Sequence, residues 1–390
     1  MNTLVRISLM FILLVCSCKS KTTFTQQTPI ELRGVWITNV DSEVLNSQES
    51  IKEAIQFLYD HHFNAVFPVV WNDAKTVYPS QVMKREFNVL IDPRYEGRDP
   101  LSEIITEAHS KNIAVIPWFE YGFAASYEKR GGLILERKSH WAARDNEGKL
   151  LTKNGFEWMN AYHPEVQSFM LELIMEVVQN YAVDGVQGDD RLPAQPIEGG
   201  YSSFTQSLYK SETGSKDVPK NFYENEWKKW RAAKLTEFTK SLYQRVKKIK
   251  VDIQVTWAPS IYPWSYDEYL QDWPSWIKQG YADVVIPQIY RSSWVEYKKA
   301  LDSQRADSLG ILNSHCLIFP GMLINVGDYV IVPEFLLKSI DYNRRQGYKG
   351  EVLFFYEGLR KADGRLANVL LATFYKQFAQ LPFKVHSSGE

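Results

Sequence analysis

Eight short apolar runs recur along the chain, and most are nearly continuous rather than alternating. Continuous apolar runs are typical of strands that are covered on both faces, as in parallel sheets. They begin at Arg33, Asn64, Ile113, Val183, Asp252, Asp283, His315 and Gly350. In order they read RGVWITN, NAVFPVV, IAVIPWFE, VDGVQGD, DIQVTWAP, DVVIPQIY, HCLIFPGML and GEVLFFYEG. The pattern therefore predicts eight buried strands.

Between these runs, apolar residues recur at the three- and four-residue spacing of an amphipathic helix. The stripes are Ile51, Ala54, Ile55 and Leu58; Leu101, Ile104, Ile105 and Ala108; Val166, Phe169, Met170, Leu173 and Val177; and Phe238, Leu242, Val246 and Ile249. Strands that alternate with helices over eight units predict an α/β fold, a (β/α)8 TIM barrel. A doubly wound open sheet is the alternative, but no Gly-rich phosphate loop follows any predicted strand.

The spacing of the predicted strands indicates where a site lies. Successive strand starts are 31, 49, 70, 69, 31, 32 and 35 residues apart, so extra residues follow strands two, three and four. They fall between strand end and helix start, at about residues 71–98, 121–163 and 190–222. Loops in that position lie on the carboxyl face of a TIM barrel, where the active sites of this fold occur. We expect a groove over strands two to four.

Composition excludes several classes of protein. The 390 residues carry 45 Lys and Arg against 46 Asp and Glu, a formal charge of −1, which argues against a nucleic-acid partner. With 45% hydrophobic and 23% charged residues, the chain is globular rather than disordered or fibrous. Its 12 Trp, 22 Tyr and 20 Phe favour a site that binds flat apolar surfaces such as sugar faces.

The N-terminus is typical of a secreted lipoprotein. Arg6 precedes a nine-residue apolar run over 7–15, too short to span a bilayer but suited to a signal peptide. Cys18 follows the small Ser17, as in a bacterial lipobox, whereas Cys16 follows the bulky Val15. We expect residues 1–17 to be removed and Cys18 to be lipidated; a plain signal peptide cut slightly later is the alternative.

The expected domain organisation follows from these features. Residues 18–30 are polar and predict a flexible tether, residues 31–383 form the barrel, and residues 384–390 form a C-terminal tail. The protein is then held at the bacterial cell envelope, on the periplasmic or outer-membrane face, through its lipid alone. No obligate protein partner is evident.

The end of the fourth predicted strand concentrates charge. Because side chains alternate along a strand, Gln187 and Asp189 face the barrel axis if Val186 faces the helices. Asp189 is the favoured carboxylate for a nucleophile, base or cation stabiliser. Asp190 comes next, with Arg191 as its charge partner or as a substrate ligand. A structural Asp–Arg pair that closes the barrel is the alternative.

A glycosidase needs a second carboxyl group that keeps its proton. Glu120 ends the third predicted strand among aromatic residues, which raise the pKa of a carboxyl group. Neighbouring strands lie ~4.8 Å apart, so Glu120 and Asp189 can approach the ~5–9 Å spacing of glycosidase carboxyl pairs. Glu357, which we expect to end strand eight, is the rival acid. The alternative for either Glu is a solvated side chain without a catalytic role.

Several further residues near the strand ends suit a sugar ligand. We expect Trp36, Trp71, Trp118, Trp257 and Tyr290 to offer stacking faces, unless they form the top layer of the core. Asn72, Asp73 and Gln288 can bond hydroxyl groups.

Other chemistries find little support in the sequence. The seven His show no zinc-binding spacing, and no serine-hydrolase elbow or phosphate loop is present. Cys316 is expected to be a buried hydrophobe at the opposite end of the barrel. Asp189 with Asp190 is only a weak signal for a cation. We expect no metal and no cofactor, since a carboxyl pair and water suffice for glycosidic hydrolysis.

Four motifs also resemble a known family. RGVW at 33–36, AVIPWFEYGF at 114–123, VDGVQGDD at 183–190 and DVVIPQIY at 283–290 resemble the glycosyl hydrolase-like 10 family of bacterial lipoproteins. The resemblance implies a barrel, and some members are implicated in cutting peptidoglycan strands stripped of peptides. Many relatives have Asn where this chain has Glu120.

A more distant resemblance concerns the fourth strand alone. VDGVQGD is similar to the DGFRxD pattern of α-amylase-type barrels, whose last Asp is the nucleophile and falls on Asp189. Gln187 stands where that pattern has Arg.

The leading hypothesis is a lipid-anchored glycoside hydrolase that acts on an envelope or extracellular polysaccharide, with peptidoglycan as the favoured substrate. Asp189 stabilises or attacks the anomeric carbon, Glu120 protonates the leaving oxygen, and Asp190 tunes the pair. The alternative is a non-catalytic glycan-binding or scaffold lipoprotein on a barrel frame.

Overall fold

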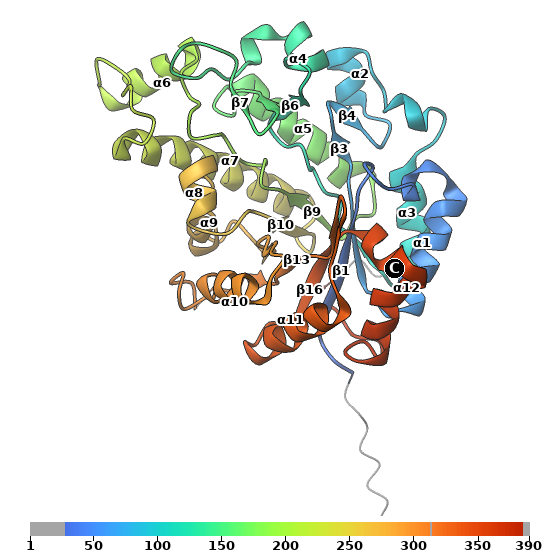
Figure 1. Cartoon of the computed structure of the whole chain (residues 1–390). Helices are drawn as coiled ribbons and strands as arrows, with labels where there is room; N and C mark the ends of the chain where they lie inside the picture. The colour runs from blue at the N-terminus through green and yellow to red at the C-terminus, as the bar shows by residue number, and fades with distance from the viewer. Residues whose placement is uncertain (1–27, 313, 385–390) are drawn as a thin grey trace, which may run out of the picture.

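Figure 1 shows the computed structural model of the chain, in which residues 28–312 and 314–384 are described. The expected signal peptide, Cys18 and most of the tether lie outside the described residues, as do tail residues 385–390. No helix among the described residues is long and apolar enough to cross a membrane.

Each of the eight predicted runs contains a parallel strand. These strands are β1 (Leu32–Ile37), β2 (Ala65–Pro68), β5 (Ala114–Val115), β9 (Gly185–Gly188), β10 (Gln254–Trp257), β11 (Val284–Val285), β12 (Leu317–Ile318), β13 (Gly321–Leu323) and β16 (Gly350–Phe354). Several are shorter than the runs because proline has no amide hydrogen for the ladder. Pro117 and Pro287 follow β5 and β11, and Pro320 separates β12 from β13.

The parallel strands form two sheets that touch at both edges. One sheet has the order β13-β16-β1-β2-β5 and the other β12-β11-β10-β9. Strands β12 and β13 belong to one segment, residues 317–323. At the other edge, a parallel bridge joins Trp118 to Gln187, and the Gln187 amide donates to the Pro117 carbonyl at 2.9 Å. An α/β fold built on parallel strands is therefore confirmed.

Helices follow the strands, except between β12 and β13, and cover the outside of the sheets (Figure 1). The helices are α1 (Gln48–Asp60), α3 (Pro100–His109), α5 (Pro164–Asn180), α7 (Asn225–Ile249), α9 (Trp273–Lys278), α10 (Trp294–Ser303), α11 (Pro333–Arg345) and α12 (Tyr356–Ala372). The predicted stripes are buried in α1, α3, α5 and α7, except that Ile249 is exposed where α7 ends.

Smaller elements lie between the carboxyl end of a strand and the helix that completes the unit. After β1 comes a short 3-10 turn (Val44–Asn46), and after β2 come β3 (Trp71–Asn72), β4 (Lys75–Thr76), α2 (Gln81–Phe87) and a 3-10 turn (Pro93–Tyr95). After β5 come β6 (Ala124–Tyr127), α4 (Gly132–Arg137), a 3-10 turn (Ser139–Trp141), β7 (Thr152–Lys153) and β8 (Phe156–Trp158). Later units carry α6 (Ser203–Thr213), α8 (Trp264–Tyr269), β14 (Asn325–Val326) and β15 (Tyr329–Val330). All of them follow strand ends, and α2, α4, α6, β3, β4, β6 and β7 lie in the upper part of Figure 1.

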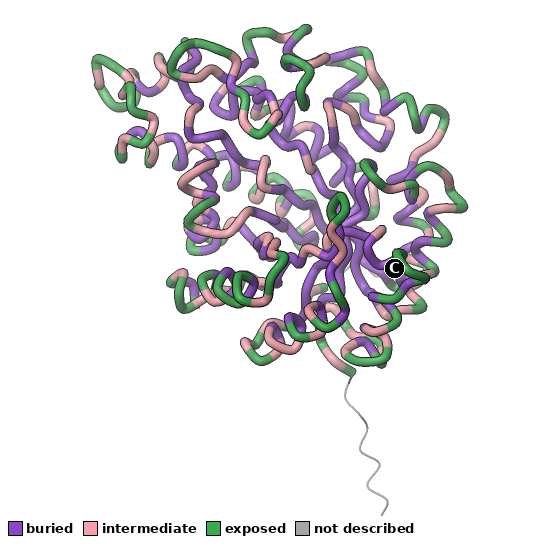
Figure 2. Tube along the Cα trace, in the orientation of Figure 1, coloured by how far each residue is buried: buried purple, intermediate pink, exposed green. Residues whose placement is uncertain are grey.

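The core and the chain ends complete this layout. Buried residues follow the strands, whereas exposed residues lie on the outer helix faces and loops (Figure 2). Ile30 pairs with Gln380 just before β1, so both chain ends leave the fold at the amino ends of the strands. The carboxyl ends of the strands are therefore opposite the point at which the chain enters the fold.

Candidate active site

Three carboxyl groups surround the guanidinium of Arg191 beyond the ends of β5 and β9. Arg191 Nη2 donates to Asp189 Oδ2 at 3.3 Å and to Glu120 Oε1 at 3.4 Å, and Nη1 lies 3.2 Å from Asp190 Oδ1. Since Glu120 and Asp189 contact the same nitrogen, their two oxygens are separated by no more than the sum of these contacts. The structure thus brings together the four charged residues that the sequence singled out on these two strands.

The backbone makes this convergence possible at a close crossing. Gly122 has a φ of +49°, and a Cβ atom there would lie only 2.1 Å from the carbonyl oxygen of Arg191. The Phe123 amide donates to the same carbonyl at 2.9 Å. Glycine is therefore required at position 122 both for its backbone conformation and because a side chain has no space there. The segment after β5 and the segment after β9 are in contact at this point.

Asp189 is held by donors on every side. It follows β9 directly and its side chain is 3% exposed. Its Oδ1 accepts from Gln288 Nε2 at 2.8 Å and from the Asp190 amide at 2.7 Å. Gln271 Nε2 donates to the Asp189 carbonyl oxygen at 2.9 Å. The inward direction expected from strand alternation is consistent with these buried contacts.

Glu120 is oriented by the β3–β4 hairpin and by Arg191. Asn72, in β3, donates from Nδ2 to Glu120 Oε2 at 2.5 Å. Arg191 Nε donates to the Glu120 carbonyl oxygen at 3.0 Å. The Glu120 side chain remains 19% exposed, so it can be reached from solvent more readily than Asp189.

Burial shifts the pKa of both carboxyl groups upward. Burial raises the pKa of Glu120, although Arg191 and the Asn72 amide oppose the shift. Burial, followed by repulsion from Asp190, raises the pKa of Asp189 well above its ordinary value, again against Arg191. One cation thus faces three carboxyl groups, and the pKa of Glu120 and of Asp189 is raised despite its presence.

Two aromatic rings contact the guanidinium of Arg191. Its guanidinium lies 4.7 Å from the Phe156 ring centre and 5.8 Å from that of Tyr121. Such cation–π contacts favour the charged form and restrict its position. Sequence reasoning missed both rings and Gln271; Tyr121 adjoins Glu120, but no local pattern marks Phe156 or Gln271.

The structure corrects the expectation for four indoles. Trp36, Trp71 and Trp257 are at most 1% exposed and Trp118 is 4% exposed. The ring nitrogens of the first three donate to Gln187 Oε1, the Gly122 carbonyl and the Tyr281 carbonyl. They pack as the top of the core and have no face free for a sugar.

The remaining expected ligands lie around the cluster or away from it. Tyr290 packs on Phe354, with ring centres 5.2 Å apart, and burial and then the charges of Asp189 and Asp190 raise its pKa. Asp73 pairs instead with Lys75 and Lys129, at 3.2 and 2.6 Å.

The rival acid lies in a different setting from the one expected. Strand β16 ends at Phe354, and Glu357 lies in the first turn of α12 rather than at a strand end. Its Oε1 accepts from Ser42 Oγ at 2.8 Å. The described contacts of Glu357 therefore involve the segment after β1 and not Asp189.

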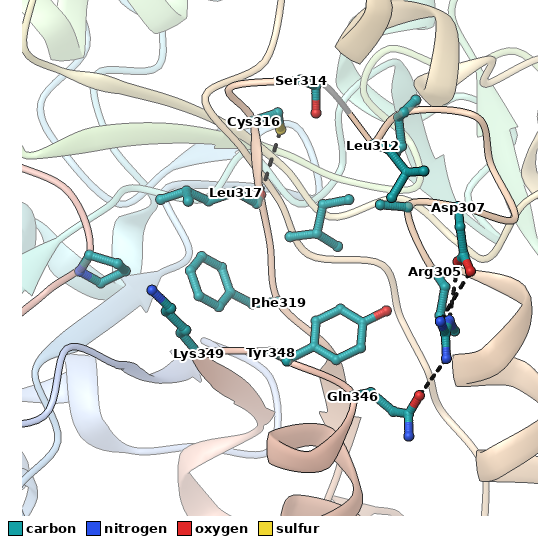
Figure 3. Close-up of a pocket in the computed structure, with 15 residues that line it drawn as sticks. Arg305, Asp307, Leu312, Ser314, Cys316, Leu317, Phe319, Gln346, Tyr348 and Lys349 are labelled. Carbon is teal, nitrogen blue, oxygen red and sulfur yellow. Dashed lines mark hydrogen bonds and ion pairs between the residues drawn. The ribbon is translucent and has the colours of Figure 1, made fainter.

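A separate cavity of about 400 Å³ lies at the amino ends of the strands, and Figure 3 shows its lining. Cys316 forms part of its wall and is half-buried, where we expected a fully buried residue. Burial raises the pKa of this thiol, which argues against a thiolate there. Arg305 on the same wall is already paired with Asp307 and Gln346.

Metal binding was considered for the described residues as well. Over 28–312 and 314–384, no group of three or more His, Cys, Asp and Glu side chains is arranged to hold a metal ion. The positive charge between the three acids is instead the guanidinium of Arg191.

Comparison with known proteins bears on the family. A family model described as "Glycosyl hydrolase-like 10" matches residues 31–322. "Glycosyl hydrolase DigH" of Escherichia coli strain K12 is 24% identical over 334 residues, covering 71% of this chain and 73% of that protein. "Glycosyl hydrolase YngK" of Bacillus subtilis strain 168 is 25% identical over 392 residues, covering 91% and 74%.

Solved structures show the same architecture. The glycoside hydrolase domain of PgaB (BpsB) from Bordetella bronchiseptica has a TM-score of 0.63 at 15% identity, covering 87% of this chain and 99% of that one. The catalytic domain of β-amylase from Paenibacillus polymyxa has a TM-score of 0.60 at 10% identity, covering 87% and 95%. At these identities the likeness establishes a fold shared with glycosidases and no more.

The raised pKa values predict an effect on stability. The folded chain holds the Asp189 proton more tightly than the unfolded chain, so stability falls as pH rises above about 4, the ordinary value for Asp. Asp189→Asn is neutral throughout and should raise the Tm near neutral pH, with a smaller gain near pH 4. Thermal unfolding at both pH values measures this.

Asp217→Asn is the matched control, because the Asp217 side chain is 95% exposed, and it should leave the Tm unchanged at both pH values. A Tm that falls near neutral pH on Asp189→Asn would show instead that the donors around Asp189 hold it ionised.

Proposed function

The chain belongs to the glycosyl hydrolase-like 10 family, and we propose that it hydrolyses glycosidic bonds with the carboxyl pair Glu120 and Asp189. The observation that carries the proposal is their shared contact with Arg191 Nη2, at 3.4 and 3.3 Å. The contacts limit the separation of those oxygens to about 6.7 Å, compatible with the ~5–9 Å spacing at which two carboxyl groups act on one glycosidic bond.

The environments of the two groups favour different roles. Burial raises the pKa of Glu120 and it is partly accessible, which suits a general acid that protonates the leaving oxygen. Asp189 accepts from three donors, which would stabilise its ionised form while it attacks or stabilises the anomeric carbon. Asp190 tunes the pair, since its charge raises the pKa of Asp189.

Substrate access to Asp189 requires Arg191 to move. The Asp189 carboxyl is 3% exposed and Arg191 lies against it. In our proposal the incoming sugar displaces the guanidinium from Asp189, while Asp190 and the rings of Phe156 and Tyr121 keep it near. Gln288 and the Asp190 amide continue to donate to Asp189 and favour its ionised form, and Glu120 carries the proton in our proposal.

We further propose that the two sheets form one closed (β/α)8 barrel. The Trp118–Gln187 bridge and the shared segment 317–323 support closure at the two edges. In this barrel the inserted elements after β2, β5 and β9 form walls around the carboxyl cluster, as the long loops of TIM-barrel enzymes do.

The proposed substrate is a polysaccharide of the cell envelope, with peptidoglycan glycan strands favoured by the resemblance to envelope lipoproteins. The proposed location follows from the lipobox-like Cys18. About ten residues separate Cys18 from Thr28, which span at most ~35 Å when extended. Because the chain enters at the amino ends of the strands, a lipid there would leave the carboxyl cluster facing away from the membrane.

A glycan-binding protein without catalytic activity is the second candidate. It is favoured by one observation: Asp189 is both buried and ion-paired, as expected of a structural acid. In a hydrolase, carboxyl-to-amide substitutions abolish turnover. In a protein that only binds glycan, the same substitutions change nothing, because there is no turnover to lose.

Substitution of the carboxyl pair tests the proposal. Reducing ends released from denuded glycan strands should fall on the order of 10³-fold or more for Asp189→Asn. They should fall about 10²- to 10⁴-fold for Glu120→Gln, because the leaving oxygen then lacks an acid. Glu357→Gln is the control and should retain activity; a loss there with activity kept by Glu120→Gln would reassign the acid.

Asn72 offers a subtler test of the acid. Its amide lowers the pKa of Glu120, so Asn72→Leu should raise that pKa further. An acid works only while protonated, so the high-pH limb of the kcat/KM profile should move to higher pH. A limb that stays in place while activity persists would show that Glu120 is not the group that titrates.

The anchor is tested by Cys18→Ala. Loss of the acylated thiol should move the protein from the membrane fraction to the soluble fraction, measured by fractionation and by labelling with a fatty-acid analogue. Membrane retention of the unlabelled variant would contradict anchoring through Cys18.

A further inference from the structure

Two exposed aromatic rings flank the β7–β8 hairpin near the carboxyl cluster. Tyr127, which ends β6, is 43% exposed, and Trp264, which begins α8, is 45% exposed. Both follow strand ends, on the side of the fold that holds Glu120 and Asp189. Neither was singled out by the sequence, since nothing local distinguishes them from the other 52 aromatic residues.

The hairpin holds Tyr127 in place. Its turn is formed by Asn154 and Gly155, with φ values of +53° and +81°, as in a two-residue type I′ turn. A Cβ atom on Gly155 would lie 2.5 Å from the Tyr127 ring, so the missing side chain allows the ring to rest on the turn. The ring also packs edge-on against Phe156, with centres 5.1 Å apart.

The same turn reaches the second ring. Asn154 Nδ2 donates to Tyr269 Oη at 2.9 Å, and the Tyr269 and Trp264 rings lie 5.4 Å apart. Burial, followed by the charge of Asp190, raises the pKa of Tyr269 to about 12.

The two exposed rings are thus linked through the β7–β8 hairpin, and Tyr127 is one aromatic neighbour away from the charged cluster. On one side, Phe156 contacts both the Arg191 guanidinium, at 4.7 Å, and Tyr127. On the other, Tyr269 contacts Trp264 and accepts from Asn154 in the turn that precedes Phe156.

Polar groups accompany these rings. Lys153 Nζ lies 5.1 Å from the Tyr269 ring centre and pairs with Glu198 and Glu268 at 2.9 and 2.7 Å. Both carboxylates remain partly exposed, at 35% and 29%. An aromatic face beside hydroxyl-bonding groups is the composition of a sugar-binding surface.

We propose that Tyr127 and Trp264 stack on sugar units of the substrate beyond the bond that is cut. The inference rests on the proposed function and deepens it: the substrate is a glycan chain longer than a disaccharide, held on both sides of the β7–β8 turn. Short glycosides reach the carboxyl pair without contacting either ring.

The test measures binding separately from hydrolysis. In the Glu120→Gln background, calorimetry compares denuded peptidoglycan strands with a disaccharide fragment. Tyr127→Ala and Trp264→Ala should each weaken strand binding about three- to tenfold through loss of the stacking face, and leave disaccharide binding unchanged. Tyr127→Phe should restore strand affinity, because the ring and not its hydroxyl makes the contact.

Phe378→Ala is the matched control: this ring is 47% exposed and packs on Tyr59 and His62, away from the carboxyl cluster. Unchanged strand affinity in both ring variants, an equal loss in the control, or no strand binding at all would overturn the proposal. A different result separates the two proposals. If strand binding depends on the rings but the unsubstituted protein releases no reducing ends, then the proposed hydrolase activity is wrong and the proposed sugar-binding role of the rings stands.

Discussion

The candidate site depends on a single buried cation among three carboxyl groups. Removing charged groups from water is costly, and one guanidinium cannot neutralise three acids. The structure offsets this cost with donors to Asp189 from Gln288 and the Asp190 amide, and with the Asn72 amide on Glu120. The remaining cost raises the pKa of Glu120 and of Asp189, and a carboxyl group with a raised pKa is what acid catalysis requires.

The fold supplies this cluster through the meeting of parallel strand ends. Strands β5 and β9 are adjacent at the edge where the two sheets touch, so the residues that directly follow these strands lie close together. Gly122 allows the segments that follow β5 and β9 to cross in contact. Strand β8 places the Phe156 ring against the Arg191 guanidinium. The insertion after β5 therefore both supports the charged residues and presents Tyr127 beside them.

Much of this arrangement could be predicted from the sequence, for identifiable reasons. Continuous apolar runs located the strands, and the alternation of side chains along a strand placed Asp189 inward. Both features can be read from neighbouring residues in the chain. Arg191 adjoins Asp190 in the chain, so that pairing was equally accessible, whereas the contact of Arg191 with Glu120, 71 positions away, was not predicted. Trp36, Trp71, Trp118 and Trp257 were misjudged because a position near a strand end does not reveal which later segment will cover it. Phe156 is 35 positions from Arg191, and only the tertiary fold joins them.

The most direct measurement is a pH titration of carboxyl ¹³C resonances of Asp and Glu in the folded protein, assigned with single amide substitutions. We predict that Glu120 titrates above its ordinary value, that Asp189 titrates well above its own, and that titration of one shifts the other, because they share Arg191. If both ionise at ordinary values, about 4, without mutual influence, then the cluster retains no proton and the proposed acid does not exist.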